Sequence, residues 1–131
     1  MADAAAWTSL FLGLFLVAAA LGELRRPGQW HRMIEEIESS PALQMTVGLL
    51  ELALGALVYL ANRSGGVEDG LALAMQLLGG LMVAEALVIM AFSDIYIHFW
   101  MRKLGTRSRG WALFVILIGA ALGLAGLFRF F

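Results

Sequence analysis

The sequence has no cysteine and few charged residues, and each shortage excludes a class of protein. Without cysteine, the chain forms no disulfide framework, carries out no thiol chemistry and offers no thiolate ligand to a metal. Charged residues make up 15% of the 131 residues and the formal net charge is −1, so the chain lacks the basic field that nucleic-acid binding needs. We therefore expect no nucleic-acid partner.

Apolar residues, in contrast, make up 61% of the chain, against about 45–50% in an ordinary soluble domain. A chain of this length cannot enclose so much apolar surface in its own core, because small domains bury the smallest share of their surface. The composition predicts a small integral membrane protein that has the lipid bilayer around it.

Four apolar runs are each long enough to cross a bilayer as a helix, which takes about 20 residues. Ser40 and Asp69 stand where the second and third runs begin and are good N-cap residues. The sequence thus predicts an all-α, single four-span membrane domain over residues 1–131. The spans are expected at about 4–24, 41–61, 70–92 and 110–131.

The distribution of Lys and Arg predicts the orientation, since these residues accumulate in cytoplasmic loops. Seven of them lie in the two long connecting segments, and two, Arg63 and Arg129, lie on the opposite side. We expect loops 25–40 and 94–109 in the cytoplasm and both termini outside. In a bacterium this means the inner membrane, with periplasmic termini.

The two halves of the chain share one plan, in which an amphipathic stretch separates two apolar helices. Similar runs recur at an offset of 67 residues in the first helices and 71 in the second, which indicates an internal repeat of 1–64 and 68–131. Shared apolar, Gly-rich composition is the alternative explanation. The prediction is two similar helical hairpins, each with an amphipathic connecting helix on the cytoplasmic side. Residues 94–104 either continue the third helix or lie in the interface.

Two carboxylic acids fall inside the apolar runs, where an ionisable group is costly and marks a candidate functional site. Glu51 lies in the middle of the second span, between Gly48 and Gly55 on one helical face. It is either a proton- or cation-binding carboxylate or a neutral acid that bonds to a neighbouring helix, with Gln76 or Tyr59 as partner.

Glu85 lies in the third span, on the cytoplasmic side of its middle. Bulky apolar residues flank it on its helical face, namely Leu81, Met82, Val88 and Ile89. These neighbours predict an apolar pocket, which suits a group that exchanges protons and equally suits a buried structural acid. Glu23 and Asp94, at the ends of the first and third spans, are expected to be solvated boundary residues.

Histidine and acid pairs occur in both connecting segments at the i,i+4 spacing that puts two side chains on one helical face. His31 pairs with Glu35, and Asp94 pairs with His98. If the pairs face each other they offer four ligands to a divalent metal, and His98 among aromatic residues is also a candidate tetrapyrrole ligand. Ordinary interfacial histidines are the alternative, and we predict no cofactor.

Small residues recur at the spacing that allows close helix packing in membranes. Gly119 and Gly123 form a GxxxG motif, and Gly80 precedes Ala84 by four residues. The glycines expected at helix contacts are Gly48, Gly55, Gly80, Gly119, Gly123 and Gly126. The pattern favours a homo-oligomer or assembly into a larger membrane complex.

No enzyme motif occurs in the chain, and its segments outside the spans are too short for a separate active site, so we expect no enzyme. The size and four-span plan are similar to those of small multidrug resistance transporters. Those transporters carry a Glu in the middle of their first helix, whereas here the first helix has Glu23 at its end, so no activity is carried over from them.

Two functions remain. The first is a homo-oligomeric transporter or channel for protons, cations or small cationic solutes, using Glu51 and Glu85. The second is a non-catalytic accessory or assembly subunit of a larger membrane complex.

Overall fold

The computed structural model describes residues 3–65 and 68–130, with the backbone alone for residues 103–108. The described part is helical throughout and has no strand. Its elements are α1 (Ala4–Arg25), α2 (Gln29–Glu38), α3 (Pro41–Asn62), the 3₁₀ turn η1 (Arg63–Gly65), α4 (Gly70–Ala91) and α5 (Ser93–Phe128). Residues 1, 2, 66, 67 and 131 of the predicted domain lie outside the described residues.

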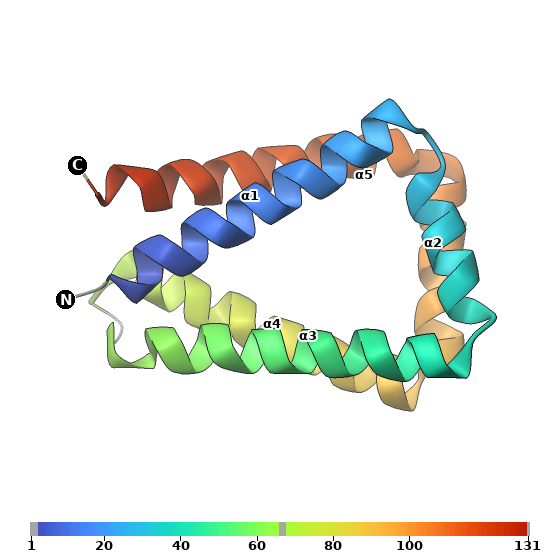
Figure 1. Cartoon of the computed structure of the whole chain (residues 1–131), viewed down its shortest axis with the longest axis horizontal. Coiled ribbons are helices and arrows are strands. Elements are labelled where there is room, and N and C mark those ends of the chain that lie inside the picture. The colour runs from blue at the N-terminus through green and yellow to red at the C-terminus, as the bar shows by residue number, and fades with distance from the viewer. Residues whose placement is uncertain (1–2, 66–67, 131) are drawn as a thin grey trace.

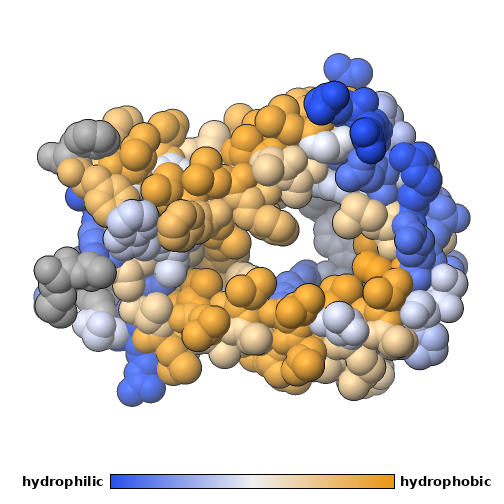
Figure 2. Space-filling model, in the orientation of Figure 1, coloured by the Kyte–Doolittle hydropathy of each residue, from blue (hydrophilic) through white to orange (hydrophobic). Residues whose placement is uncertain are grey.

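Four of these helices are long and apolar enough to cross a membrane, as predicted. They are α1, α3, α4 and the part of α5 from Arg109 to Phe128. Figure 2 shows apolar side chains over much of the surface along these helices, which suits lipid contact, and hydrophilic side chains gathered mainly toward the two ends. The four helices are what a small membrane protein requires.

Local chemistry explains where the helices begin. Asp3, Ser40 and Asp69 are N-caps of α1, α3 and α4, and each side chain accepts a hydrogen bond from a backbone N–H of the first turn. Pro41 follows Ser40 at a position where its missing N–H costs nothing. Gly28 starts α2 with a φ of +91°, a conformation that favours glycine.

The long helices pack in two antiparallel pairs, α1 with α5 and α3 with α4. Figure 1 shows α1 approaching the α3–α4 pair at the end that holds both termini, whereas the two pairs lie apart at the other end, where α2 lies. The helices of each predicted hairpin, α1 with α3 and α4 with α5, contact each other far less. The hairpin arrangement is therefore not confirmed.

Glycines bring the backbones of each pair together. A Cβ on Gly13 of α1 would lie 2.5 Å from the Gly119 oxygen of α5, and a Cβ on Gly79 of α4 would lie 2.7 Å from the Gly55 oxygen of α3. The prediction named Gly80 in α4, but a Cβ there would meet nothing within 4 Å. Glycine at these crossings allows main chains to approach more closely than any side chain permits.

The two crossings are alike in detail. Gly79 follows Gly13 by 66 residues, and Gly119 follows Gly55 by 64, and each glycine meets equivalent neighbours in its own crossing. The sequence alignment used offsets of 67 for the first helices and 71 for the second. For the second helices, the equivalent crossings thus give an offset seven residues smaller, which is two turns of helix. Duplication of the chain stays a prediction.

The second connecting segment is continuous with the fourth span. Helix α4 ends at Ala91, Phe92 departs from helical geometry, and α5 begins at Ser93. Its first part lies beside α2 across the end of the molecule before α5 turns along α1 (Figure 1). The ring centres of Trp100 and Trp111 are 5.2 Å apart, although a straight helix would separate their Cα atoms by about 16 Å, so α5 bends between them. Because α4 has already ended at Ala91, residues 94–104 do not continue the third helix.

Both termini lie at one end of the molecule and both connecting segments lie at the other (Figure 1). This follows from an even number of spans. Which end faces the cytoplasm stays a prediction, and the side chains of Lys103 and Arg107, which entered that count, lie outside the described residues.

Candidate functional site

Glu51 and Glu85 meet across the α3–α4 pair. Their side chains are close enough to interact with each other. The crossing explains this contact: a Cβ on Gly55 would meet Met82, and one on Gly48 would meet Met90. Because the helices are antiparallel, the segment between Gly48 and Gly55 lies along the segment between Met82 and Met90, which carries Glu85.

The partners expected for Glu51 were wrong. The Gln76 side chain donates instead to the backbone oxygen of Asn62, at 2.9 Å, and Tyr59 contributes its backbone to the crossing with Gly79. Both residues lie toward the terminal end from Glu51. The acid that reaches Glu51 is the second predicted acid, so two separate candidates form one site.

Tyr96 from the first part of α5 completes the site. Its hydroxyl donates a hydrogen bond to Oε2 of Glu85. Trp100, one turn later, forms a side-chain hydrogen bond with Tyr96, in which the indole N–H is the donor. Burial, followed by the bond to Glu85, raises the pKa of Tyr96 far above its usual range. Tyr96 therefore stays protonated and acts as a donor to the carboxyl pair.

The chemistry of the pair follows from its position between two apolar helices. Two ionised carboxylates side by side repel each other, so a proton or another cation bound between them relieves that repulsion. The sequence of α3 and α4 contains no Lys or Arg that could neutralise the charge left when that proton leaves. The arrangement can therefore exchange a proton for another cation.

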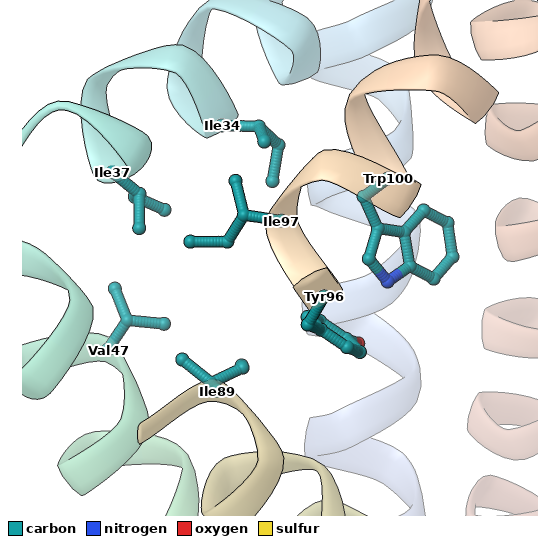
Figure 3. Close-up of a pocket in the computed structure, with 7 residues that line it drawn as sticks. All are labelled: Ile34, Ile37, Val47, Ile89, Tyr96, Ile97 and Trp100. Atoms are coloured by element: carbon teal, nitrogen blue, oxygen red, sulfur yellow. The ribbon is translucent and has the colours of Figure 1, made fainter. Parts of the chain in front are cut away.

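A small apolar cavity of about 60 Å³ lies one helical turn from the pair, toward the connecting segments (Figure 3). Val47 is one turn from Glu51, and Ile89 is one turn from Glu85. The aliphatic lining is Ile34, Ile37, Val47, Ile89 and Ile97, and the rings of Tyr96 and Trp100 complete it.

The predicted apolar pocket around Glu85 is thus only partly right. Ile89 lines the cavity, but Leu81 is 67% exposed on the outer surface. The other lining residues come from α2, α3 and α5.

The predicted histidine and acid ligands do not come together. The His31 Nδ1 lies 3.4 Å from the Glu35 carboxylate, whereas Asp94 and His98 are exposed on α5. Among the described residues, no three His, Asp or Glu side chains are placed to hold a metal ion. The reason is that α2 and α5 pack through the isoleucines of the cavity, which leaves their polar faces apart.

Glu23 is a correction to the expectation of a solvated boundary residue. It is buried, with 1% exposure, and its two carboxylate oxygens accept hydrogen bonds from the backbone N–H of Gly28, at 3.0 Å, and of Trp30, at 2.7 Å. The Trp30 indole in turn donates to the Ala19 oxygen of α1, at 3.2 Å. Glu23 therefore fixes α2 against α1.

The terminal end carries an ion cluster that the sequence reasoning missed. Arg129, just after α5, binds Asp69 through two hydrogen bonds of 2.9 and 2.7 Å and binds Asp3 at 3.0 and 3.3 Å. The guanidinium holds the pKa of both carboxyl groups below their usual range. Since Asp3 and Asp69 cap α1 and α4, Arg129 joins three helix ends.

A second polar contact lies near the same end. Asn62, with 2% exposure, donates to the Thr8 hydroxyl of α1 at 3.1 Å. With the Gln76 bond, Asn62 links α1, α3 and α4, so this end of the bundle is held by polar contacts as well as by buried Ala5, Ala6, Ala72 and Met75.

Comparisons with protein families, with curated proteins and with solved structures find no match to this chain. The site is therefore interpreted from its own geometry.

Proposed function

We propose that the protein is a small membrane transporter in which Glu51 and Glu85 bind and release a proton in exchange for a cation. The observation that carries the proposal is the meeting of two acids across one helix crossing, Glu51 midway along α3 and Glu85 on the facing turn of α4. Placing an acid inside an apolar span costs free energy, and in membrane proteins such acids mark ion or substrate pathways.

The arrangement of the helix pairs supports a pathway. The site lies on the α3–α4 pair, and Tyr96 reaches it from the helix that packs against α1. Figure 2 shows an opening between the two pairs. Rocking of one pair against the other would expose the carboxyl groups to one side of the membrane and then to the other.

Assembly into a homo-oligomer is part of the expectation, but its basis has changed. Gly119 and Gly123 already pack against Gly13 of the same chain. Their GxxxG motif therefore does not account for contact between copies. Gly80 and Ala84 are exposed on α4 and remain available for contact between copies.

Replacing each acid by glutamine tests the transport proposal, because an amide keeps the shape and hydrogen-bonding capacity but cannot titrate. We expect Glu51→Gln and Glu85→Gln to fold and assemble while losing proton flux in proteoliposomes between about pH 5.5 and pH 8.5. Glu36→Gln, on the exposed face of α2, is the matched control and should keep wild-type flux. Full, unshifted flux in both site variants would reject transport by this pair.

The accessory role is the second candidate, and the opening in Figure 2 favours it, since a helix of a larger partner would fill that space. Purification in a mild detergent separates the two. A stable assembly of this chain alone supports the transporter, whereas stoichiometric copurification with a larger membrane protein supports the accessory subunit.

A further inference from the structure

Three arginines surround the turn between α1 and α2. Arg25 and Arg26 stand at the end of α1, Arg32 lies near the start of α2, and all three are exposed. The Arg32 side chain folds back toward the turn, since a Cβ on Gly28 would lie 3.7 Å from its Nη1. Figure 2 shows strongly hydrophilic side chains at this corner of the molecule. Among the described residues, no ion pair joins any of the three arginines to an acid.

The acids closest to the turn in the sequence leave it positively charged. Glu23 is 1% exposed, and its carboxylate oxygens accept the hydrogen bonds of Gly28 and Trp30 described above. Glu35 on α2 lies beside His31, at 3.4 Å. Three exposed arginines therefore stand against one buried acid at the turn. The terminal end differs, because there Arg129 binds both Asp3 and Asp69.

Trp30 indicates the depth of the turn in a bilayer. Its indole donates to the Ala19 oxygen of α1, and tryptophan rings are enriched where the hydrocarbon meets the headgroups. Arg25 follows Ala19 by six residues, which is about 9 Å along a helix. The headgroup layer on each side is about 5–8 Å thick. The arginines therefore lie at the level of the lipid phosphates.

An apolar strip on α1 leads away from the arginines toward the middle of the span. Leu14, Ala18 and Leu21 precede Arg25 at steps of three and four residues, so the four side chains share one helical face. Leu14 is 56% exposed and Leu21 is 48% exposed. The small side chain of Ala18 between the two leucines leaves room for a chain to lie along the helix. A molecule with an anionic head and an apolar chain matches both the turn and the strip.

We propose that the α1–α2 turn binds an anionic phospholipid, with its phosphate among Arg25, Arg26 and Arg32 and an acyl chain along the strip of Leu14, Ala18 and Leu21. The planar guanidinium presents paired N–H groups that match phosphate oxygens. A zwitterionic headgroup would bring its own cation beside three arginines, so an anionic headgroup binds better. This lipid site goes beyond the transport proposal and does not depend on what Glu51 and Glu85 carry.

Native mass spectrometry of the detergent-purified protein tests the lipid site. The probes are phosphatidylglycerol and phosphatidylcholine with the same acyl chains, and we expect the first to bind about tenfold more tightly. Arg25→Gln should weaken phosphatidylglycerol binding about fivefold, and the double substitution of Arg25 and Arg26 by glutamine should weaken it about 25-fold. Arg63→Gln is the matched control: it removes the same charge from an exposed position at the terminal end and should leave binding unchanged.

Three results would overturn the proposal. The first is equal binding of the two lipids. The second is an equal loss in Arg25→Gln and Arg63→Gln, which would show that overall charge decides. The third is displacement of the lipid by glycerol 3-phosphate at the same concentration as the lipid itself, which would show a site for free phosphate without a role for the acyl chain. If the double variant does not fold, Arg32→Gln should still weaken phosphatidylglycerol binding about fivefold, and unchanged binding in that variant would equally reject the site.

Discussion

Glu23 accepts the backbone hydrogen bonds at the start of α2 that an N-cap side chain usually accepts. Gly28, at the start of α2, has no side chain to accept a hydrogen bond from the first turn. Glu23, at the end of α1, reaches across the turn and accepts from two backbone N–H groups instead. A carboxylate is also favoured near the positive end of a helix dipole. The acid thus stabilises the turn between the first span and its connecting helix.

Replacing Glu23 by glutamine should destabilise the protein. The amide has one oxygen, so one of the two N–H groups loses its acceptor, at a cost of about 1–3 kcal/mol. The free energy of unfolding in detergent, measured by circular dichroism with added denaturant, tests this. Glu36→Gln on α2 is exposed and should change it by less than about 0.5 kcal/mol. Equal effects of the two substitutions would contradict the assigned role.

The sequence identifies some site residues because their chemistry conflicts with their surroundings. Glu51 and Glu85 stand out as acids in apolar runs, and the pattern alone marks both. It does not show that they meet, because that contact depends on how α3 crosses α4. The sequence does not mark Tyr96 as part of the site, since the break at Phe92 that turns it toward Glu85 has no recognisable signal. Glu23 looks like any acid at a span end until the path of α2 is known.

At the level of the helices, two adjacent glycines in α4 have opposite surroundings. A Cβ on Gly79 would lie 2.7 Å from backbone atoms of Gly55 and Tyr59, whereas one on Gly80 would meet nothing within 4 Å. Backbone cannot yield as the end of a flexible side chain can. The spacing of α3 and α4, and with it the meeting of Glu51 and Glu85, therefore depends on Gly79.

Gly79→Ala and Gly80→Ala form a matched pair for the crossing. We expect Gly79→Ala to lower the free energy of unfolding by about 1–3 kcal/mol through overpacking and to reduce flux through the Glu51–Glu85 pair. Gly80→Ala should be neutral or stabilise by up to about 1 kcal/mol, because alanine favours the helix. A larger loss of unfolding free energy in Gly80→Ala than in Gly79→Ala would contradict the assignment of the α3–α4 crossing to the Gly79 face of α4.

The existence of the long helices follows from the sequence, but their partners do not. Apolar run length and the caps at Ser40 and Asp69 give four helices, and the structure confirms them. Lipid is as apolar as the side chains, so no hydrophobic signal in the sequence distinguishes a helix-facing residue from a lipid-facing one. The choice between Gly79 and Gly80, and the two-turn displacement in the repeat alignment, are consequences of this ambiguity.

For the molecule as a whole, the ends of three helices meet in the cluster of Arg129, Asp3 and Asp69. The two hydrogen bonds to Asp69 fix the orientation of the Arg129 guanidinium. All three side chains are partly exposed, and solvent weakens such ion pairs. Because the two acids also cap α1 and α4, the cluster keeps both helix pairs together at the terminal end.

This cluster should make the closure of the terminal end depend on pH. Arg129 depresses the pKa of Asp3 and Asp69, so their stabilisation is complete above about pH 4, the usual range for Asp, and is lost as pH falls through the depressed values. We expect Arg129→Gln to lower the unfolding midpoint at neutral pH, with a difference from wild type that shrinks toward about pH 2. A difference that stays constant down to that pH would contradict the assignment.

Helix α5 connects the surroundings of Glu85 with the opposite end of the molecule. One uninterrupted backbone runs from Ser93, beside the residues that hold Glu85, to Phe128, immediately before Arg129. A displacement of Tyr96 when the acids lose their proton would move the start of this helix, whose other end is followed by the residue that binds Asp3 and Asp69. One continuous helix thus connects a change of charge at the acids with the ion cluster at the terminal end.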